Sequence, residues 1–175
     1  MTISADYQKQ QQKLHENPAY GVASLHFAPL VAQVYKQGDC QSICDYGAGK
    51  KRLLGALAKH GVNPEDYYPF DPAFPEYGPP KPADLVVCID VLEHVEPPFI
   101  QSVLLDLKKV VRRLGVFTMH SGPAGKTLDD GRNAHLTQEP ASWWLPKICE
   151  HFEPVQLQLH ELMGPGFWVI VRPKP

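Results

Sequence analysis

The stretch of residues 42–51, S-I-C-D-Y-G-A-G-K-K, constrains the fold more than any other part of the chain. A short apolar run ends in Asp45, two glycines follow at Gly47 and Gly49, and an amphipathic run begins at Arg52. This order is typical of a strand, a tight turn and a helix. Glycine permits positive φ and close approach of a ligand, and a helix N-terminus offers free N–H groups. The motif alone leaves open a nucleotide site and a turn that binds nothing.

Length and charge limit the classes of protein. The 175 residues are 43% hydrophobic, which predicts one globular domain: an N-terminal helical segment, 1–38, and a core, 39–175. The net charge is −2 without a basic stripe, so no strong nucleic-acid signal is present. No signal-type or membrane-spanning apolar run occurs, and we expect a cytoplasmic protein without a membrane partner.

The cysteines and histidines do not indicate a metal site. Four cysteines occur without a C-x-x-C pair, and no two histidines have the H-x-x-x-H spacing of zinc ligands. Cys44 and Cys88 lie in apolar runs, which predicts buried free thiols in a reducing compartment.

Apolar periodicity predicts alternating strands and helices. Helices are expected over residues 5–16, 29–36, 52–60, 97–111 and 139–152. Strands are expected over residues 43–45, 67–70, 84–90, 115–120, 155–162 and 167–172. The last two strands flank Gly164-Pro165-Gly166 and read as an antiparallel hairpin. The pattern predicts an α/β fold with a Rossmann-like, mostly parallel sheet that helices cover on both faces.

Three predicted strands end in an acid: Asp45, Asp71 and Asp90. In parallel sheets, ligands bind at the carboxyl ends of the strands. Asp71 follows Asp45 by 26 residues, close to the spacing of about 20 at which an acid accepts hydrogen bonds from a ribose. Each acid alone could be an ordinary surface residue, but three at one edge beside a glycine turn predict an adenosine site.

These motifs resemble those of the class I S-adenosylmethionine-dependent methyltransferases, in the group with a D-V-L-E-H signature. The matching stretches are D-Y-G-A-G at 45–49, F-D-P-A at 70–73 and C-I-D-V-L-E-H-V at 88–95. The resemblance spans roughly 43–172, and the terminal hairpin fits that fold. It implies S-adenosylmethionine as cofactor and methyl transfer to an O or N atom of a small molecule or a side chain.

The resemblance also implies which residues bind the cofactor. The methionine part would lie against the turn formed by Asp45, Tyr46, Gly47, Ala48 and Gly49. Asp71 would hold the ribose hydroxyls, with Phe70 and Pro72 beside the adenine. The region near the sulfonium would be lined by Asp90, Val91 and Leu92.

Two features depart from the family pattern. Lys51 stands where the turn usually carries a third glycine, and either crowds the turn or, with Lys50, meets the cofactor carboxylate. The chain between Asp71 and Asp84 is too short for a strand and a helix. We therefore expect the usual third strand to be lost and replaced by a Pro-rich loop.

Acceptor chemistry is assigned to the segment 121–138. Methyl transfer requires an oriented acceptor and removal of its proton, and histidine is the usual base at neutral pH. His135 is the predicted base, with Arg132 and Asn133 binding the acceptor, because this segment follows a strand that ends at the acidic edge. His120, which ends that strand, is a further acceptor-binding candidate. The alternative is a loop that only packs on itself.

Three functions are weighed. A methyltransferase is favoured over a non-catalytic S-adenosylmethionine-binding or protein-interaction module, which Lys51 and the lost strand would suit. An NAD-dependent oxidoreductase is disfavoured because the turn lacks G-x-G-x-x-G. The acceptor site must come from the N-terminal helices, the Pro-rich loop and the segment 121–138, or from the second subunit of a homodimer.

Overall fold

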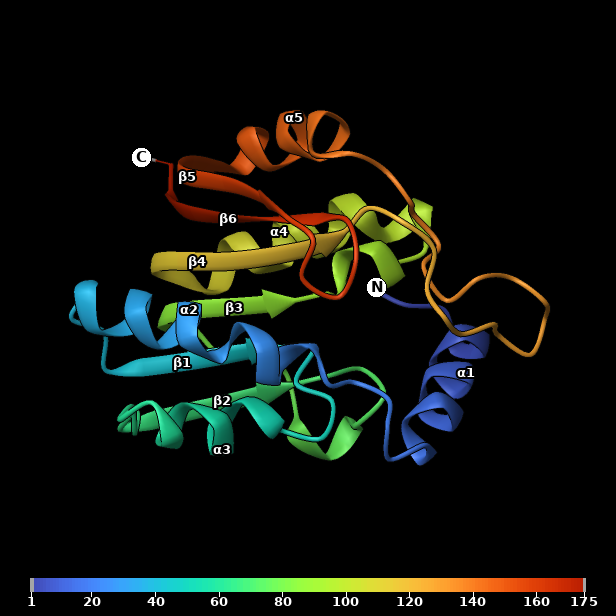
Figure 1. Ribbon diagram of the computed structural model, residues 1–175, viewed down its shortest axis with the longest axis horizontal. Coiled ribbons are helices and arrows are strands. Elements are labelled where there is room, and N and C mark those ends of the chain that lie inside the picture. Colours follow the sequence, from blue (N-terminus) through green and yellow to red (C-terminus); the bar gives the residue numbers. More distant parts are fainter. Residues whose placement is uncertain (1, 175) are drawn as a thin grey trace.

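A six-stranded sheet with the order β2-β1-β3-β4-β6-β5 forms the centre of the protein (Figure 1). The structure, a computed structural model, describes residues 2–174. The strands are β1 Ser42–Tyr46, β2 Asp66–Phe70, β3 Ala83–Ile89, β4 Val111–His120, β5 Phe152–His160 and β6 Gly166–Pro173. The first four pair in parallel, and β6 pairs antiparallel with both β4 and β5. The predicted Rossmann-like sheet with a terminal antiparallel hairpin is confirmed.

Helices cover both faces of the sheet. They are α1 Ala5–Glu16, α2 Ala23–Gln37, α3 Arg52–Lys59, α4 Ile100–Val110 and α5 Ala141–His151. One apolar cluster joins α2 and α3 to the sheet, and another joins α4 and α5 to the opposite face. The remaining helix, α1, stands beyond the carboxyl ends of the strands (Figure 1). None of the helices within residues 2–174 has the length and apolar character needed to cross a membrane.

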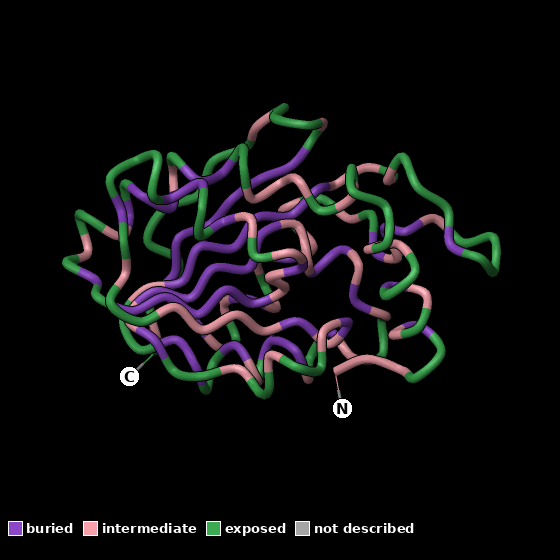
Figure 2. The backbone as a smooth tube through the Cα atoms, turned by 90° about the horizontal axis from the view of Figure 1, so that it is seen from below, coloured by how far each residue is buried: buried purple, intermediate pink, exposed green. Residues whose placement is uncertain are grey.

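The central strand β3 shows why the sheet is buried on both faces. Successive side chains of a strand point to opposite faces, so a strand covered on both sides must be apolar throughout. Val86 and Cys88 belong to the cluster with α4 and α5, and Leu85 and Val87 belong to the cluster with α2 and α3. The strands form the buried centre of the molecule, surrounded by exposed segments (Figure 2).

The helix α2 begins at Ala23, six residues before the start that Pro29 suggested. Proline inside a helix removes one backbone hydrogen bond. The helix nevertheless continues, because Phe27 and Ala28 before the proline and Val31 after it are all buried in the same apolar cluster. Tertiary packing therefore outweighs the local signal for a helix start.

The predicted loss of a third strand is confirmed. Between β2 and β3 the structure has only one short 3-10 helix, η1, Pro75–Tyr77. The strand β2 therefore forms an edge of the sheet, where Pro69 is tolerated because a proline is acceptable on edge strands.

Lys51 fits the turn without crowding it. The residue adopts the left-handed conformation with φ of 56°, which is the region that favours glycine. Its side chain is exposed, and Nζ lies 4.8 Å from the centroid of the Tyr77 ring. Lys50 instead donates hydrogen bonds to the carbonyl oxygens of Asn17 and Tyr20. Both lysines are thus held by neighbouring chain segments.

We expect Lys51→Gly to be more stable than Lys51→Ala by about 0.5–1 kcal/mol. Both variants lose the contact with Tyr77, and only alanine keeps a Cβ in the left-handed conformation. Urea unfolding of the two variants measures the difference. Equal stability, or a more stable alanine variant, would show that the backbone at this position carries no strain.

Candidate functional site

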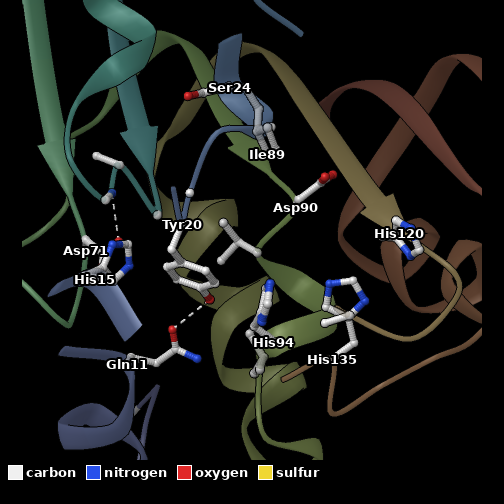
Figure 3. Close-up of a pocket in the computed structure, with 18 of the residues that line it drawn as sticks. Gln11, His15, Tyr20, Ser24, Asp71, Ile89, Asp90, His94, His120 and His135 are labelled. Atoms are coloured by element: carbon white, nitrogen blue, oxygen red, sulfur yellow. Dashed lines mark hydrogen bonds between the residues drawn. The ribbon is translucent and has the colours of Figure 1, made fainter. Parts of the chain in front are cut away.

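A cavity of about 410 Å³ lies at the carboxyl ends of β1, β2 and β3 (Figure 3). Its floor comes from the segments that follow these strands, namely Gly47–Gly49, Asp71–Pro72 and Asp90–Val91. The helix α1 and the loop 121–138 supply the other walls. This volume falls within the range of about 300–1,000 Å³ that small-molecule sites occupy.

The glycine turn ties the ends of three strands together. The N–H groups of Gly47 and Ala48 both donate to the carbonyl oxygen of Phe70, at 2.7 and 2.9 Å. Gly47 has φ of 86°, and a Cβ at this position would come within 2.2 Å of Val91 Cγ2. Only glycine therefore allows the segments after β1 and β3 to approach this closely.

Asp71 is buried and accepts two backbone hydrogen bonds. Oδ2 accepts from Gly49 N at 2.9 Å, and Oδ1 accepts from Ala73 N at 2.8 Å. Burial raises the pKa of this carboxyl, while these two N–H groups oppose the rise. A carboxylate oxygen can accept two hydrogen bonds, so each oxygen retains capacity for a ligand hydroxyl.

The other two acids of the sheet edge also line the cavity. Asp45 accepts a hydrogen bond from the Tyr67 hydroxyl, and burial raises its pKa to about 7. Asp90 has φ of 49°, although it is not a glycine. Its backbone N–H donates to Thr118, whose hydroxyl donates to the Asp90 carboxylate, and burial raises the pKa of that carboxyl. These bonds hold Asp90 at the inner wall of the cavity.

Three histidine rings form the wall opposite the glycine turn, and the Gly122 peptide fixes two of them. Gly122 N–H donates to His120 Nδ1 at 3.0 Å, and the Gly122 carbonyl accepts from His135 Nδ1 at 2.7 Å. His120 Nε2 in turn donates to the Met163 carbonyl at 3.2 Å. Because a neutral imidazole has one donor and one acceptor, both nitrogens of His120 are engaged and His135 keeps an unprotonated Nε2.

The third ring, His94, has the same arrangement as His135. Its Nδ1 donates to the Ala134 carbonyl at 2.7 Å, which leaves Nε2 as an acceptor. The ring centroids of His94 and His135 are 4.7 Å apart. Burial lowers the pKa of His94 to about 3 and lowers that of His135 as well. Both rings are therefore neutral at pH 7.

The helix α1 and the loop 121–138 are bound to each other above the cavity. Lys13 Nζ contacts the Asp129 carboxylate at 2.8 Å, and Gln10 donates to Asp130 at 3.0 Å. Beneath these polar contacts, Tyr7 packs in a small apolar cluster with Leu128 and Ala134. We call this assembly of α1 and the loop 121–138 the cap. The contacts between α1 and the tip of the loop are an exposed ion pair and a hydrogen bond from an amide side chain, which are individually weak.

Comparison with known proteins finds no matching protein-family model and no matching curated protein. Solved structures do match. The 1,6-didemethyltoxoflavin-N1-methyltransferase of Burkholderia thailandensis, with bound S-adenosylhomocysteine, has a TM-score of 0.67 at 14% identity, over 100% of this chain and 92% of that one. The magnesium protoporphyrin IX methyltransferase of Synechocystis, with bound S-adenosylmethionine, has a TM-score of 0.66 at 11% identity, over 99% and 100%. The N-methyltransferase NodS of Bradyrhizobium japonicum has a TM-score of 0.59 at 12% identity, over 98% and 100%.

The chain has the fold of the class I S-adenosylmethionine-dependent methyltransferases.

Most predicted cofactor-binding residues line the cavity. They are Asp45, Tyr46, Gly47, Ala48, Gly49, Phe70, Asp71, Pro72, Asp90 and Val91. Leu92 does not, because its side chain is fully buried in the apolar cluster against α4 and α5. Its neighbour Glu93 is likewise fully buried, whereas Asp90, Val91 and His94 of the same stretch line the cavity.

The predicted acceptor residues divide into two groups. His120 and His135 line the cavity, whereas Arg132 and Asn133 lie outside its lining. Arg132 forms an ion pair with Asp130 on the exposed tip of the loop 121–138. The position of Asn133 corrects its expected role, because its Oδ1 accepts the backbone N–H groups of Ala124 and His135 at 2.8 and 2.9 Å. Asn133 therefore shapes the loop that carries His135.

Sequence reasoning missed the cap side of the cavity. Gln11 and Tyr20 line it, and the Gln11 amide lies between two phenols: it donates to Tyr7 and accepts from Tyr20, at 2.6 and 3.2 Å. His15 also lines it, and its Cε1 would meet a Cβ at Gly49 at 2.9 Å. The polar composition of the first helix indicated a surface helix, and no local signal could reveal that one side of it covers a cavity.

Sequence reasoning also missed Glu93, which hydrogen-bonds to the histidine wall from the core side. Its side chain is fully buried, and Oε1 accepts the His120 N–H at 2.8 Å. Its backbone carbonyl accepts the Thr137 N–H at 3.0 Å. Burial, together with the nearby charge of Asp90, raises the pKa of the Glu93 carboxyl well above its usual value. Glu93 therefore connects η2, Leu92–His94, by buried hydrogen bonds to His120 and Thr137, which lie on either side of the cap loop.

We expect Glu93→Gln to gain stability relative to the parent protein as pH rises above about 4.5. A carboxyl with a raised folded-state pKa stabilises the fold fully below its unfolded-state pKa and loses that contribution as pH rises toward the folded-state value. Glutamine keeps the acceptor oxygen without this loss, so the difference should grow by about 1.4 kcal/mol per pH unit. Urea unfolding at several pH values measures it.

The matched control is Glu161→Gln, whose side chain is exposed between β5 and β6. It should show no comparable trend with pH. A constant stability difference between Glu93→Gln and the parent at all pH values would mean that the pKa of Glu93 is the same in the folded and unfolded protein.

Proposed function

We propose that the protein is an S-adenosylmethionine-dependent methyltransferase acting on an O or N atom of a small molecule or a side chain. The observation that carries the proposal is the juxtaposition, in a cavity of this fold, of a glycine turn, a buried Asp71 and a neutral His135 with an available Nε2. The fold neighbours that were crystallised with S-adenosylmethionine or S-adenosylhomocysteine support the choice of cofactor.

The cavity offers the polar groups that such a cofactor requires. Asp71 would bind the ribose hydroxyls through the remaining capacity of its two oxygens. Phe70 and Pro72 would lie beside the adenine, and the turn after Asp45 would hold the methionine part. Asp90 and Val91 would lie near the sulfonium.

When bound, this cofactor supplies an electrophilic methyl group: the acceptor lone pair forms the new bond to carbon while the C–S electron pair stays on sulfur. The chain's own part is to orient the acceptor and take its proton. His135 Nε2 would receive that proton and pass it to water. Gly122 fixes the ring through Nδ1, and Asp90 would stabilise the imidazolium as it forms. The cap would exclude bulk water from the reacting atoms.

We expect S-adenosylhomocysteine to bind and Asp71→Asn to weaken that binding roughly ten- to a hundredfold. A ribose diol that loses a charged acceptor forfeits about 1.5–3 kcal/mol. Titration calorimetry measures both affinities. The control is Asp66→Asn, which changes an exposed acid at the opposite end of the same strand. Unchanged affinity in Asp71→Asn would refute the ribose role, and tighter binding of NAD than of S-adenosylhomocysteine would refute the cofactor.

We expect His135→Gln to lower turnover by about 10²–10⁴-fold while the affinity for S-adenosylhomocysteine stays nearly constant. Burial lowers the pKa of His135 below its usual 6.5, so the base stays unprotonated as pH falls through that value. The acid limb of kcat/KM should therefore lie below pH 6.5. His26→Gln, an exposed histidine on α2, is the control. Equal loss of turnover and cofactor affinity would indicate a structural role for His135.

A further inference from the structure

The inner wall of the cavity presents two imidazole nitrogens as acceptors. The Nδ1 atoms of His94 and His135 each donate to a backbone carbonyl, so each Nε2 carries a lone pair. Within residues 2–174, neither Nε2 forms a hydrogen bond, and both atoms are accessible from the cavity. Figure 3 shows the two rings side by side, below Asp90. The pair therefore offers two adjacent acceptor atoms to whatever occupies the cavity.

The phenol beside this pair adds a third acceptor. Tyr20 lies on the other side of His94, with the ring centroids 6.4 Å apart (Figure 3). Its hydroxyl donates to Gln11 Oε1 at 3.2 Å, and the Gln11 amide N–H in turn donates to the Tyr7 hydroxyl. The Tyr20 oxygen is thus left with lone pairs only. Burial also raises the pKa of Tyr20, which keeps the phenol neutral.

The neighbouring His120 ring offers no free donor, and the charge of the lining favours cations. His120 has both ring nitrogens bonded to backbone groups. Among the described residues that line the cavity, Lys126 is the only Lys or Arg, and it is exposed in the cap loop. Four acids line the same cavity, namely Asp45, Asp71, Asp90 and Glu96. A carboxylate placed against the imidazole pair would face lone pairs without a donor, which is costly in a buried site.

From this geometry we infer that the methyl acceptor is a primary amine or an amino-substituted ring, whose N–H groups donate to His94 and His135. The inference rests on the proposed methyltransferase function and narrows it to nitrogen acceptors. A single amino group carries two donors, so it can satisfy both Nε2 atoms at once, whereas a hydroxyl can satisfy only one. A site built to bind an N–H group rejects analogues that lack it, because its own buried polar atoms are then left unpaired.

Four probes of one shape test this recognition: aniline, phenol, toluene and benzoate. Each is titrated into protein carrying ¹⁵N-labelled histidine, with and without S-adenosylhomocysteine, while the Nε2 signals are followed by NMR. Aniline should bind at least about tenfold more tightly than toluene or benzoate, and more tightly than phenol. It should shift the signals of His94 and His135 and leave that of exposed His26 unchanged.

Variants separate recognition from general packing. His94→Phe keeps an aromatic ring without the lone pair, so the preference for aniline over toluene should fall by about tenfold, whereas His26→Gln should retain it. Circular dichroism confirms folding. If His94→Phe does not fold, the probe series on the parent protein still decides the outcome.

The outcomes are distinct. Tighter binding of benzoate or phenol than of aniline would overturn the inference, and so would aniline binding that leaves both Nε2 signals in place, or no aniline binding up to its solubility. Failure of S-adenosylhomocysteine to bind would instead refute the methyltransferase function. The titration without that ligand would then still show whether the His94–His135 pair recognises N–H donors.

Discussion

The hydrogen bonds between the glycine turn and the end of β2 are the constraint on which the site depends. One carbonyl, that of Phe70, accepts two N–H groups of the turn, and Asp71 accepts a third from Gly49. These bonds bring the ends of β1 and β2 together, while Val91 fills the space that Gly47 leaves open. Three acids then converge at one edge because the strands are parallel and in register. The tie and the strand pairing together place the three acids around one cavity.

Convergence at a sheet edge brings a cost, since buried carboxylates resist ionisation. Asp45, Asp90 and Glu93 all have raised carboxyl pKa values, chiefly because of burial. Burial also disfavours the charged form of an imidazole, so the pKa values of His94 and His135 are lowered and not raised. The result is a histidine wall that is neutral at pH 7, where the direction of hydrogen bonding governs which ligand group fits. The backbone carbonyls of Gly122 and Ala134 set that direction by fixing the tautomers of His135 and His94.

The sequence predicted the part of this arrangement that is local in the chain. The strand, turn and helix at 42–59 were predictable because apolar period and glycines act over a few residues. The strand β3 was predictable for the same reason, as was the loss of a strand between Asp71 and Asp84, where the chain is simply too short. The start of α2 was not, because it depends on packing against α3 rather than on a capping residue.

The cap and its hydrogen bonds were beyond sequence reasoning for a physical reason. Its contacts join residues more than 100 positions apart, such as Lys13 with Asp129 and Gln10 with Asp130. Exposed polar side chains of this kind have no periodic signature in the sequence. Arg132 and Asn133 were predicted to bind the acceptor because the type of a side chain does not reveal whether it points into the cavity. The structure turns Asn133 inward to hold the loop and Arg132 outward to Asp130.

The shortened edge of the sheet explains why the cap takes on more than a covering role. In place of another strand, the Pro-rich loop supplies Phe74 and Tyr77, whose rings stack with centroids 5.2 Å apart. Tyr77 donates to the Gly49 carbonyl at 2.9 Å, and His15 of α1 packs edge-on against Phe74 with centroids 5.0 Å apart. Aromatic side chains of two separate segments thus pack together near Asp71, and one of them, His15, lines the cavity. Because α1 supplies both His15 beside Asp71 and Gln11 beside Tyr20, one helix lines the cavity on both of these sides (Figure 3).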